Sequence, residues 1–264
     1  DYEVTENIAA TGVILAGAGT LAVVILGIFC SEWFVSLFTD EKTIGAFCEE
    51  YLSICMIFCA GTFVGTMFQR FLQSIGDTYD SMVTLIAGAL TNLILDPIFI
   101  FGLAGLPAYG IKGAAMATVI GQWVAAILAI ILNKTRNPYV NIRFRGYRPK
   151  KSVLKQIYKV GLPTIITQAI GSVMVTTVNA ILMPFSSTAV AFFGVYYKLQ
   201  NFLFMPMNGL GQAAIPIVGY NYGAKNKERV HSLFRTIIPM AAGIALLATI
   251  IFLVFPEPLL NLFS

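Results

Sequence analysis

Long apolar runs separated by short polar stretches make up most of this chain. A helix needs about 20 consecutive apolar residues to cross the hydrocarbon core of a bilayer. The pattern predicts seven such helices, over residues 8–36, 51–73, 81–103, 111–133, 160–184, 189–222 and 234–255. The fifth and sixth are divided at Pro184-Phe185-Ser186-Ser187, because the apolar run around this turn sequence is too long for one span.

The composition agrees with an exterior that faces lipid. Hydrophobic residues make up 57% of the chain and charged residues only 11%, and the mean hydropathy is +0.79. A soluble domain carries about 25% charged residues, which is far more than this chain offers to water. We therefore predict an all-α, polytopic membrane protein. The first apolar run lacks a basic flank, so we expect a cut N-terminus rather than a signal peptide.

Basic residues indicate how the helices are oriented. Residues 134–159 hold nine of the seventeen Lys and Arg residues, and basic loops favour the cytoplasmic side. We predict a cytoplasmic connector here, between domains at 1–133 and 160–264, in a plasma or inner membrane. Contact with anionic lipid headgroups explains this charge better than nucleic-acid binding does. Apolar residues within 151–159 suggest an amphipathic helix on that surface.

A weak internal repeat links the two ends of the chain. Residues 25–39 and 250–264 align at an offset of 225, and eight identities fall within residues 1–39 at this offset. Both segments run outward from the cytoplasm in the predicted topology. Parallel repeats of this kind are common in transporters, so we expect the chain to begin inside one half of a longer protein and to end inside the other.

One carboxylate, Asp96, lies well inside a predicted span. Asn92 and Gly88 precede it at intervals of one helical turn, and Pro97 frees the carbonyl of Leu93 from its helical hydrogen bond. Ionisable groups at membrane depth are costly and point to function. The stripe is therefore a candidate cation or proton site. The alternative is a polar helix end at the outer interface with a proline kink.

The second half offers polar residues without any acid from Val160 to Lys227. Lys198 either meets a substrate anion or backbone carbonyls, or extends its ammonium group to the membrane surface. A candidate substrate cavity, or alternatively polar contacts between helices, is formed by Lys198, Gln168, Asn179, Gln200, Asn201 and Met205. Gly61 and Gly65 predict close helix packing rather than a site.

Motifs of enzymes are absent from the sequence. We find no phosphate loop, no nucleophile elbow and no metal-ligand spacing. We therefore expect a protein that is not an enzyme and that needs no cofactor. Transport without an ATP site would be driven by an ion gradient or would be passive.

Several motifs together resemble the multidrug and toxic compound extrusion (MATE) family. The resemblance covers the whole chain and lies in Gly76-Asp77-Thr78, in 92–102 (NLILDPIFIFG), in 110–118 (GIKGAAMAT), in Val160-Gly161-Leu162-Pro163, in 209–214 (GLGQAA) and in 219–224 (GYNYGA).

The resemblance implies a twelve-helix antiporter with two six-helix lobes, of which this chain would be helices three to nine. It implies export of cationic, lipophilic compounds in exchange for H⁺ or Na⁺, with the remaining helices of the same protein as partners. By the same resemblance, Asn92, Asp96 and Thr118 form the coupling site. We expect no metal ion other than Na⁺, which would bind near Asp96. Gly171 stands where some members carry a second-lobe glutamate. A lipid-linked oligosaccharide flippase and a non-transporting scaffold remain the alternatives.

Overall fold

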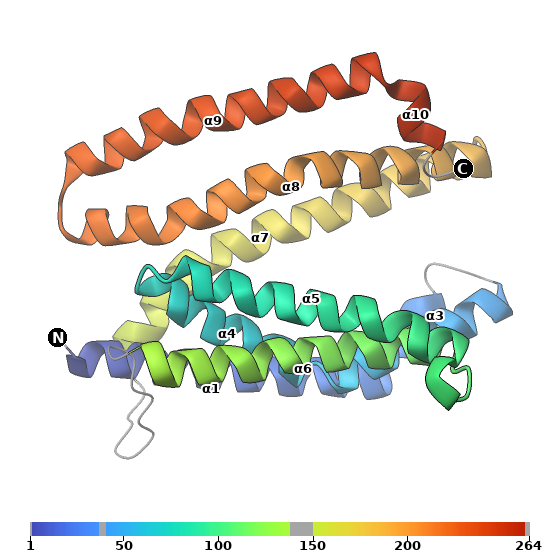
Figure 1. Cartoon of the computed structure of the whole chain (residues 1–264), viewed down its shortest axis with the longest axis horizontal. Coiled ribbons are helices and arrows are strands. Elements are labelled where there is room, and N and C mark those ends of the chain that lie inside the picture. Colours follow the sequence, from blue (N-terminus) through green and yellow to red (C-terminus); the bar gives the residue numbers. More distant parts are fainter. Residues whose placement is uncertain (1, 37–40, 138–149, 262–264) are drawn as a thin grey trace. The chain divides into compact units, whose positions relative to one another are not determined.

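The computed structural model describes residues 2–36, 41–137 and 150–261 (Figure 1). All regular structure among these residues is helical, which confirms the predicted all-α class. The chain divides into two compact units, residues 1–154 and 155–264. The division falls within the predicted connector 134–159, whose arginines at 143, 145 and 148 lie outside the described residues.

The helices follow the apolar runs of the sequence. The first unit contains α1 (Tyr2–Phe29), α2 (Ser31–Ser36), α3 (Lys42–Ile57), α4 (Ala60–Ser74), α5 (Thr78–Phe101), the short 3-10 helix η1 (Leu103–Gly105) and α6 (Ile111–Arg136). Helix α7 (Lys151–Leu182) crosses the division, and the second unit continues with α8 (Ser187–Gly223), α9 (Lys227–Val254) and α10 (Pro256–Asn261).

Five of these helices, α1, α5, α6, α7 and α9, are each long and apolar enough to cross a membrane. The number rises to seven among the described residues if each of two bent pairs is one span. One pair is α3 and α4, which meet at 51°, and the other lies within α8, at Thr188–Phe202 and Phe204–Gly223. The prediction of about seven membrane helices therefore holds when both bent pairs count as spans.

Two boundaries differ from the sequence prediction. The second span begins with α3 at Lys42 and not at residue 51, so Glu49 and Glu50 lie within this helix. Residues 151–159 are the first turns of the continuous helix α7 and not a separate surface helix. Gly161 and Pro163 both lie inside α7, and the helix continues through them.

The structure supports the internal repeat through its helix boundaries. The long helices end at Phe29 and Val254, and the short helices that follow begin at Ser31 and Pro256. Both short helices are six residues long, so their first residues and their last residues are each separated by 225 positions. Residues 37–39 and 262–264, which complete the aligned segments, lie outside the described residues.

Helix α6 is the centre of the first unit, where it packs against α3, α4 and α5. Its inward face consists of small residues, among them the fully buried Ala115, Ala117, Ala126 and Ala129. Small side chains let helix backbones approach closely in a membrane. Gly61 and Gly65 of α4 face Trp123 and Ala126 of α6, as the sequence predicts.

The second unit is packed much less densely. Helices α8 and α9 lie against each other, and Ser186 caps the start of α8 by accepting a hydrogen bond from the Thr188 amide. Of its described side chains, only Leu199 and Ala248 are buried. The second unit therefore presents most of its apolar surface outward.

Candidate functional site

The candidate coupling residues of α5 are placed by the two ends of this helix. The Asp77 carboxylate caps its start by accepting a hydrogen bond from the Asp80 amide at 3.0 Å. Gly102, in the left-handed conformation at φ 72°, ends the helix. Between these ends, Asn92 and Asp96 lie one turn apart, and Pro97 follows inside the helix.

Helix α6 brings Thr118 to this pair across the helix interface. The Asn92 amide nitrogen donates to Asp96 Oδ1 at 3.3 Å and to Thr118 Oγ1 at 3.3 Å. The Thr118 hydroxyl donates to the carbonyl of Ala114 at 2.9 Å. The three residues expected to form the coupling site therefore do lie together, in one hydrogen-bonded chain that spans two helices.

Tyr51 of α3 joins the same chain and was missed in the sequence. Its hydroxyl lies 3.3 Å from Thr118 Oγ1. The single Thr118 proton is committed to Ala114, so Thr118 accepts and Tyr51 donates. Tyr51 is 67 residues from Thr118, and an aromatic residue near a predicted membrane interface gives no signal of such a contact.

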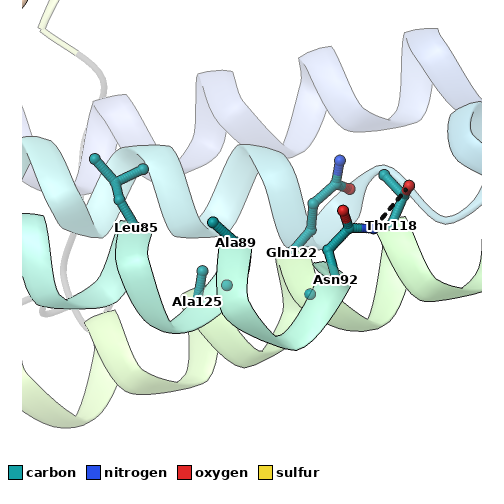
Figure 2. A pocket seen from close by; sticks show the side chains of 8 residues that line it. Leu85, Ala89, Asn92, Thr118, Gln122 and Ala125 are labelled. Atoms are coloured by element: carbon teal, nitrogen blue, oxygen red, sulfur yellow. Dashed lines mark hydrogen bonds between the residues drawn. The ribbon is translucent and has the colours of Figure 1, made fainter. Parts of the chain in front are cut away.

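A cavity of about 230 Å³ opens beside the cluster, between α5 and α6 (Figure 2). It is lined by Leu85, Gly88, Ala89, Asn92, Thr118, Gly121, Gln122 and Ala125. The polar side chains of Asn92, Thr118 and Gln122 lie together in it, and Leu85 lies toward the other end (Figure 2).

Close approach of the two helices makes this cavity. A Cβ added to Gly121 would come 2.7 Å from the Gly88 carbonyl oxygen, and one added to Gly88 would come 2.9 Å from that of Gly121. Only hydrogen atoms fit at these two positions. The cluster and the cavity therefore depend on this glycine pair, of which the sequence pattern indicated only Gly88 on α5.

A second cavity, of about 800 Å³, borders Tyr51. It is lined by Phe34, Val35, Ile44, Phe47, Cys48, Tyr51, Leu52 and Ile111. Tyr51 thus borders this apolar space and also donates to Thr118 of the first cavity. The Tyr51 hydroxyl therefore links the lining of the second cavity to Thr118 in the lining of the first.

Asp80 is a second buried carboxylate of the first unit, and it lies at the start of α5 rather than well inside the span as Asp96 does. Asp80, in the first turn of α5, is only 2% exposed, whereas Asp96 is half-buried. Arg136 Nη1 lies 2.8 and 3.0 Å from the two Asp80 carboxylate oxygens. The sequence did not show this ion pair because the partners are 56 residues apart, at adjacent ends of antiparallel helices.

Among the described residues, no hydrogen bond joins the residues expected in a second-half cavity to one another. Lys198, Gln168, Asn201 and Met205 are exposed, and Gln200 and Asn179 are half-buried. Asn201 donates to the Tyr197 carbonyl of its own helix at 3.0 Å. Asn179 Oδ1 is buried and has no hydrogen-bond partner among the described residues. A substrate cavity in this unit stays a prediction.

Comparisons with known proteins complete this description. The family model described as MatE matches residues 1–98 and 163–264. The chain is 31% identical over 255 residues to the "Probable multidrug resistance protein NorM" of Thermotoga maritima, covering 96% of this chain and 53% of that protein. It is 25% identical to the "Multidrug export protein MepA" of Staphylococcus saprophyticus, covering 100% of this chain and 57% of that protein.

A solved structure shares the fold. A "MOP superfamily transporter from Pyrococcus furiosus" matches with a TM-score of 0.92 at 24% identity, covering 100% of this chain and 58% of that one. The chain spans about half the length of the curated relatives that it matches.

Proposed function

This chain belongs to the MatE family, the multidrug and toxic compound extrusion transporters, and we propose that it forms part of a secondary active multidrug efflux transporter. The proposed transporter exports cationic, lipophilic compounds in exchange for H⁺ or Na⁺. The names of two relatives, a multidrug export protein and a probable multidrug resistance protein, support export as the activity. Its partners would be the bilayer, the substrate and the further helices that relatives of twice the length contain.

The observation that carries this proposal is the hydrogen-bonded chain of Tyr51, Thr118, Asn92 and Asp96. In this chain one carboxylate lies among neutral polar groups, and we expect this part of α5 to lie within the membrane. An ionised carboxylate in such surroundings is costly, and binding of a proton or a cation removes that cost. Asp96 is therefore suited to carry the coupling ion.

Alternating access follows if this binding favours one shape of the lobe over another. A ligand shifts a two-state equilibrium only by its differential affinity for the two states. Neutralised Asp96 needs fewer hydrogen bonds from Asn92 than ionised Asp96 does, so the link from α5 to Thr118 of α6 would change with the charge. A cationic substrate competes in this scheme because it favours the ionised carboxylate.

The multi-pass helices place the protein in a membrane, and we propose the plasma or inner membrane. The basic connector 134–159 would face the cytoplasm. Asp96 then lies in the outer half of its span, because α5 begins at Thr78 on the cytoplasmic side and Asp96 is close to its end. An ion from outside would reach Asp96 by the shorter route.

Two alternatives are less well supported. A flippase of lipid-linked oligosaccharides would need basic side chains around its cavity to hold phosphate groups. The linings of the two cavities described above contain no Lys or Arg. A non-transporting scaffold would give no reason for the polar chain between α3, α5 and α6.

The decisive experiment replaces Asp96 in the intact protein. Cells that produce Asp96→Asn should lose gradient-driven ethidium efflux while the protein still reaches the membrane in normal amounts. Glu228→Gln, at an exposed position of α9, is the matched control and should export normally. Efflux with and without an imposed Na⁺ gradient identifies the ion. Wild-type efflux by Asp96→Asn would exclude the proposed role.

A further inference from the structure

Basic side chains gather at one end of the second unit, where α7 begins, α8 ends and α9 begins (Figure 1). Six exposed Lys and Arg residues lie at this end, namely Lys155, Lys159, Lys225, Lys227, Arg229 and Arg235. Among its described residues the only acid at this end is Glu228, and none of the six forms an ion pair with a described residue. This end therefore carries positive charge that the second unit does not balance.

The lengths of α7 and α9 place this charge at the level of lipid headgroups. Lys159 stands directly before the uncharged residues 160–182 of α7, and Arg235 stands directly before the uncharged residues 236–254 of α9. At 1.5 Å per residue these segments are about 34 Å and about 28 Å long, and the hydrocarbon core of a bilayer is about 30 Å thick. When both segments lie in the core, the basic residues before them lie in the headgroup layer.

Exposed tyrosines indicate the same level independently of charge. Tyr158 directly precedes Lys159 and is 53% exposed, and Tyr220 and Tyr222, in the last turn of α8, are each 78% exposed. Tyrosine is enriched where a membrane meets water, because its ring is apolar and its hydroxyl is polar. A site for a soluble anion would give no reason for three exposed rings beside the basic residues, whereas a lipid surface accounts for both.

We propose that this end of the second unit is a docking surface for anionic phospholipids of the leaflet that it meets. Its basic side chains bind headgroup phosphates through charge-assisted hydrogen bonds, and its tyrosine rings pack beside the lipids. Anionic lipids are preferred to phosphatidylcholine, because the choline group cancels the charge of its phosphate. Most of this surface lies on α8 and α9, outside the connector 134–159 for which headgroup contact was predicted. The inference goes beyond the proposed export and does not depend on Asp96.

The test follows the thermal midpoint of the purified intact protein in detergent micelles as phosphatidylglycerol is added. Wild type should be stabilised more by phosphatidylglycerol than by the same amount of phosphatidylcholine. Lys155→Gln/Lys159→Gln should need at least about tenfold more phosphatidylglycerol for half of the effect, because each basic residue near an anionic surface contributes about fivefold to binding. Arg229→Gln/Arg235→Gln should show a similar loss. Lys155→Arg/Lys159→Arg keeps the charge and should respond as wild type does.

The matched control removes two charges from the first unit. Lys42→Gln/Lys112→Gln changes exposed lysines of α3 and α6 and should leave the phosphatidylglycerol response as in wild type. An unchanged response in both variants of the surface, or an equal loss in the control, would overturn the docking surface. Equal stabilisation by phosphatidylcholine or by inorganic phosphate would overturn the choice of an anionic lipid. These titrations involve no ion gradient or exported compound, so this inference and the proposed function fail separately.

Discussion

The two units of this protein contain similar helices but differ in how closely the helices approach. In the first unit, a Cβ added to Gly88, Gly113 or Gly121 would meet a backbone atom of a facing segment at 2.6–2.9 Å. In the second unit, a Cβ added to Gly194, Gly209 or any other described glycine would meet nothing within 4 Å. Within the described residues, some glycines of the first unit therefore mark close contacts between helices, whereas those of the second unit mark none.

This difference decides where polar side chains form a site. In the first unit, Asn92 reaches Thr118 on another helix. In the second unit, asparagine side chains bond within their own helix. Asn201 donates to the Tyr197 carbonyl, and Asn221 donates to the Ile217 carbonyl. Polar composition alone does not make a site, because hydrogen bonds across an interface need backbones that approach closely.

The largest expected difference between the units concerns charge. Arg136→Met leaves Asp80 buried without its partner and should lower the free energy of unfolding by about 2–3 kcal/mol. This is less than the cost for a fully enclosed pair, because the Arg136 side chain is 60% exposed. Denaturant titration of the intact protein in detergent measures the change. Arg235→Met, exposed on α9, should change it by less than about 0.5 kcal/mol. Equal effects would contradict the comparison.

Glycine substitution tests the close approach directly. Gly121→Ala should lower the free energy of unfolding by about 1–3 kcal/mol, because its Cβ would strike the Gly88 carbonyl. Gly194→Ala should leave it unchanged or raise it by up to about 1 kcal/mol, since alanine favours the helix and the site is open. The same titration compares the two variants. An unchanged free energy of unfolding in Gly121→Ala would show that α5 and α6 are farther apart than described.

Buried amides should be more important in the first unit than in the second. Asn133 donates to the Phe68 carbonyl of α4 at 2.8 Å and so links α6 to α4. Asn133→Leu should cost about 1–2 kcal/mol, because that carbonyl loses its additional donor. Asn221→Leu removes a bond within one exposed helix and should cost less than about 0.5 kcal/mol. Thermal midpoints of both variants would show the order, and a reversed order would count against it.

The smallest expected effect is at Tyr51. Tyr51→Phe removes one neutral hydrogen bond to Thr118 and keeps the ring that borders the apolar cavity. Efflux should fall by about two- to tenfold, as expected for about 0.5–1.5 kcal/mol, while stability changes little. Tyr220→Phe, at an exposed tyrosine of α8, is the control. An unaltered rate in Tyr51→Phe would mean that the hydroxyl plays no part in coupling.

Much of the local structure could be predicted from the sequence. The apolar runs predicted the helices, and the turn at 184–187 falls where α7 ends at Leu182 and α8 begins at Ser187. The one-turn spacing of Asn92 and Asp96 placed them on one helix face, as the hydrogen bond between them confirms. These features depend on residues only a few positions apart, so local periodicity carries the information.

Contacts between helices could not be predicted in the same way. Thr118 was assigned to the site only through family resemblance, and Tyr51 and Gln122 were missed. Asp80 was missed as a buried charge because its position at a helix end resembles an interface residue. Which face of α6 meets α5 depends on the Gly88 and Gly121 pair, and the rotation of a helix around its axis is hardly visible in a nearly uniform apolar run.

The sequence by itself determined that this chain lies in a membrane, roughly where its helices begin and end, and that Asn92 and Asp96 share a face. Helical propensity, hydrophobicity and the repeat at an offset of 225 all depend on the order of residues along the chain, so the sequence shows them directly. Only the tertiary structure decided that Tyr51, Thr118 and Gln122 surround that face. The reason is that glycine contacts set the distance between helices, and hydrogen bonds of about 3 Å form only at that distance.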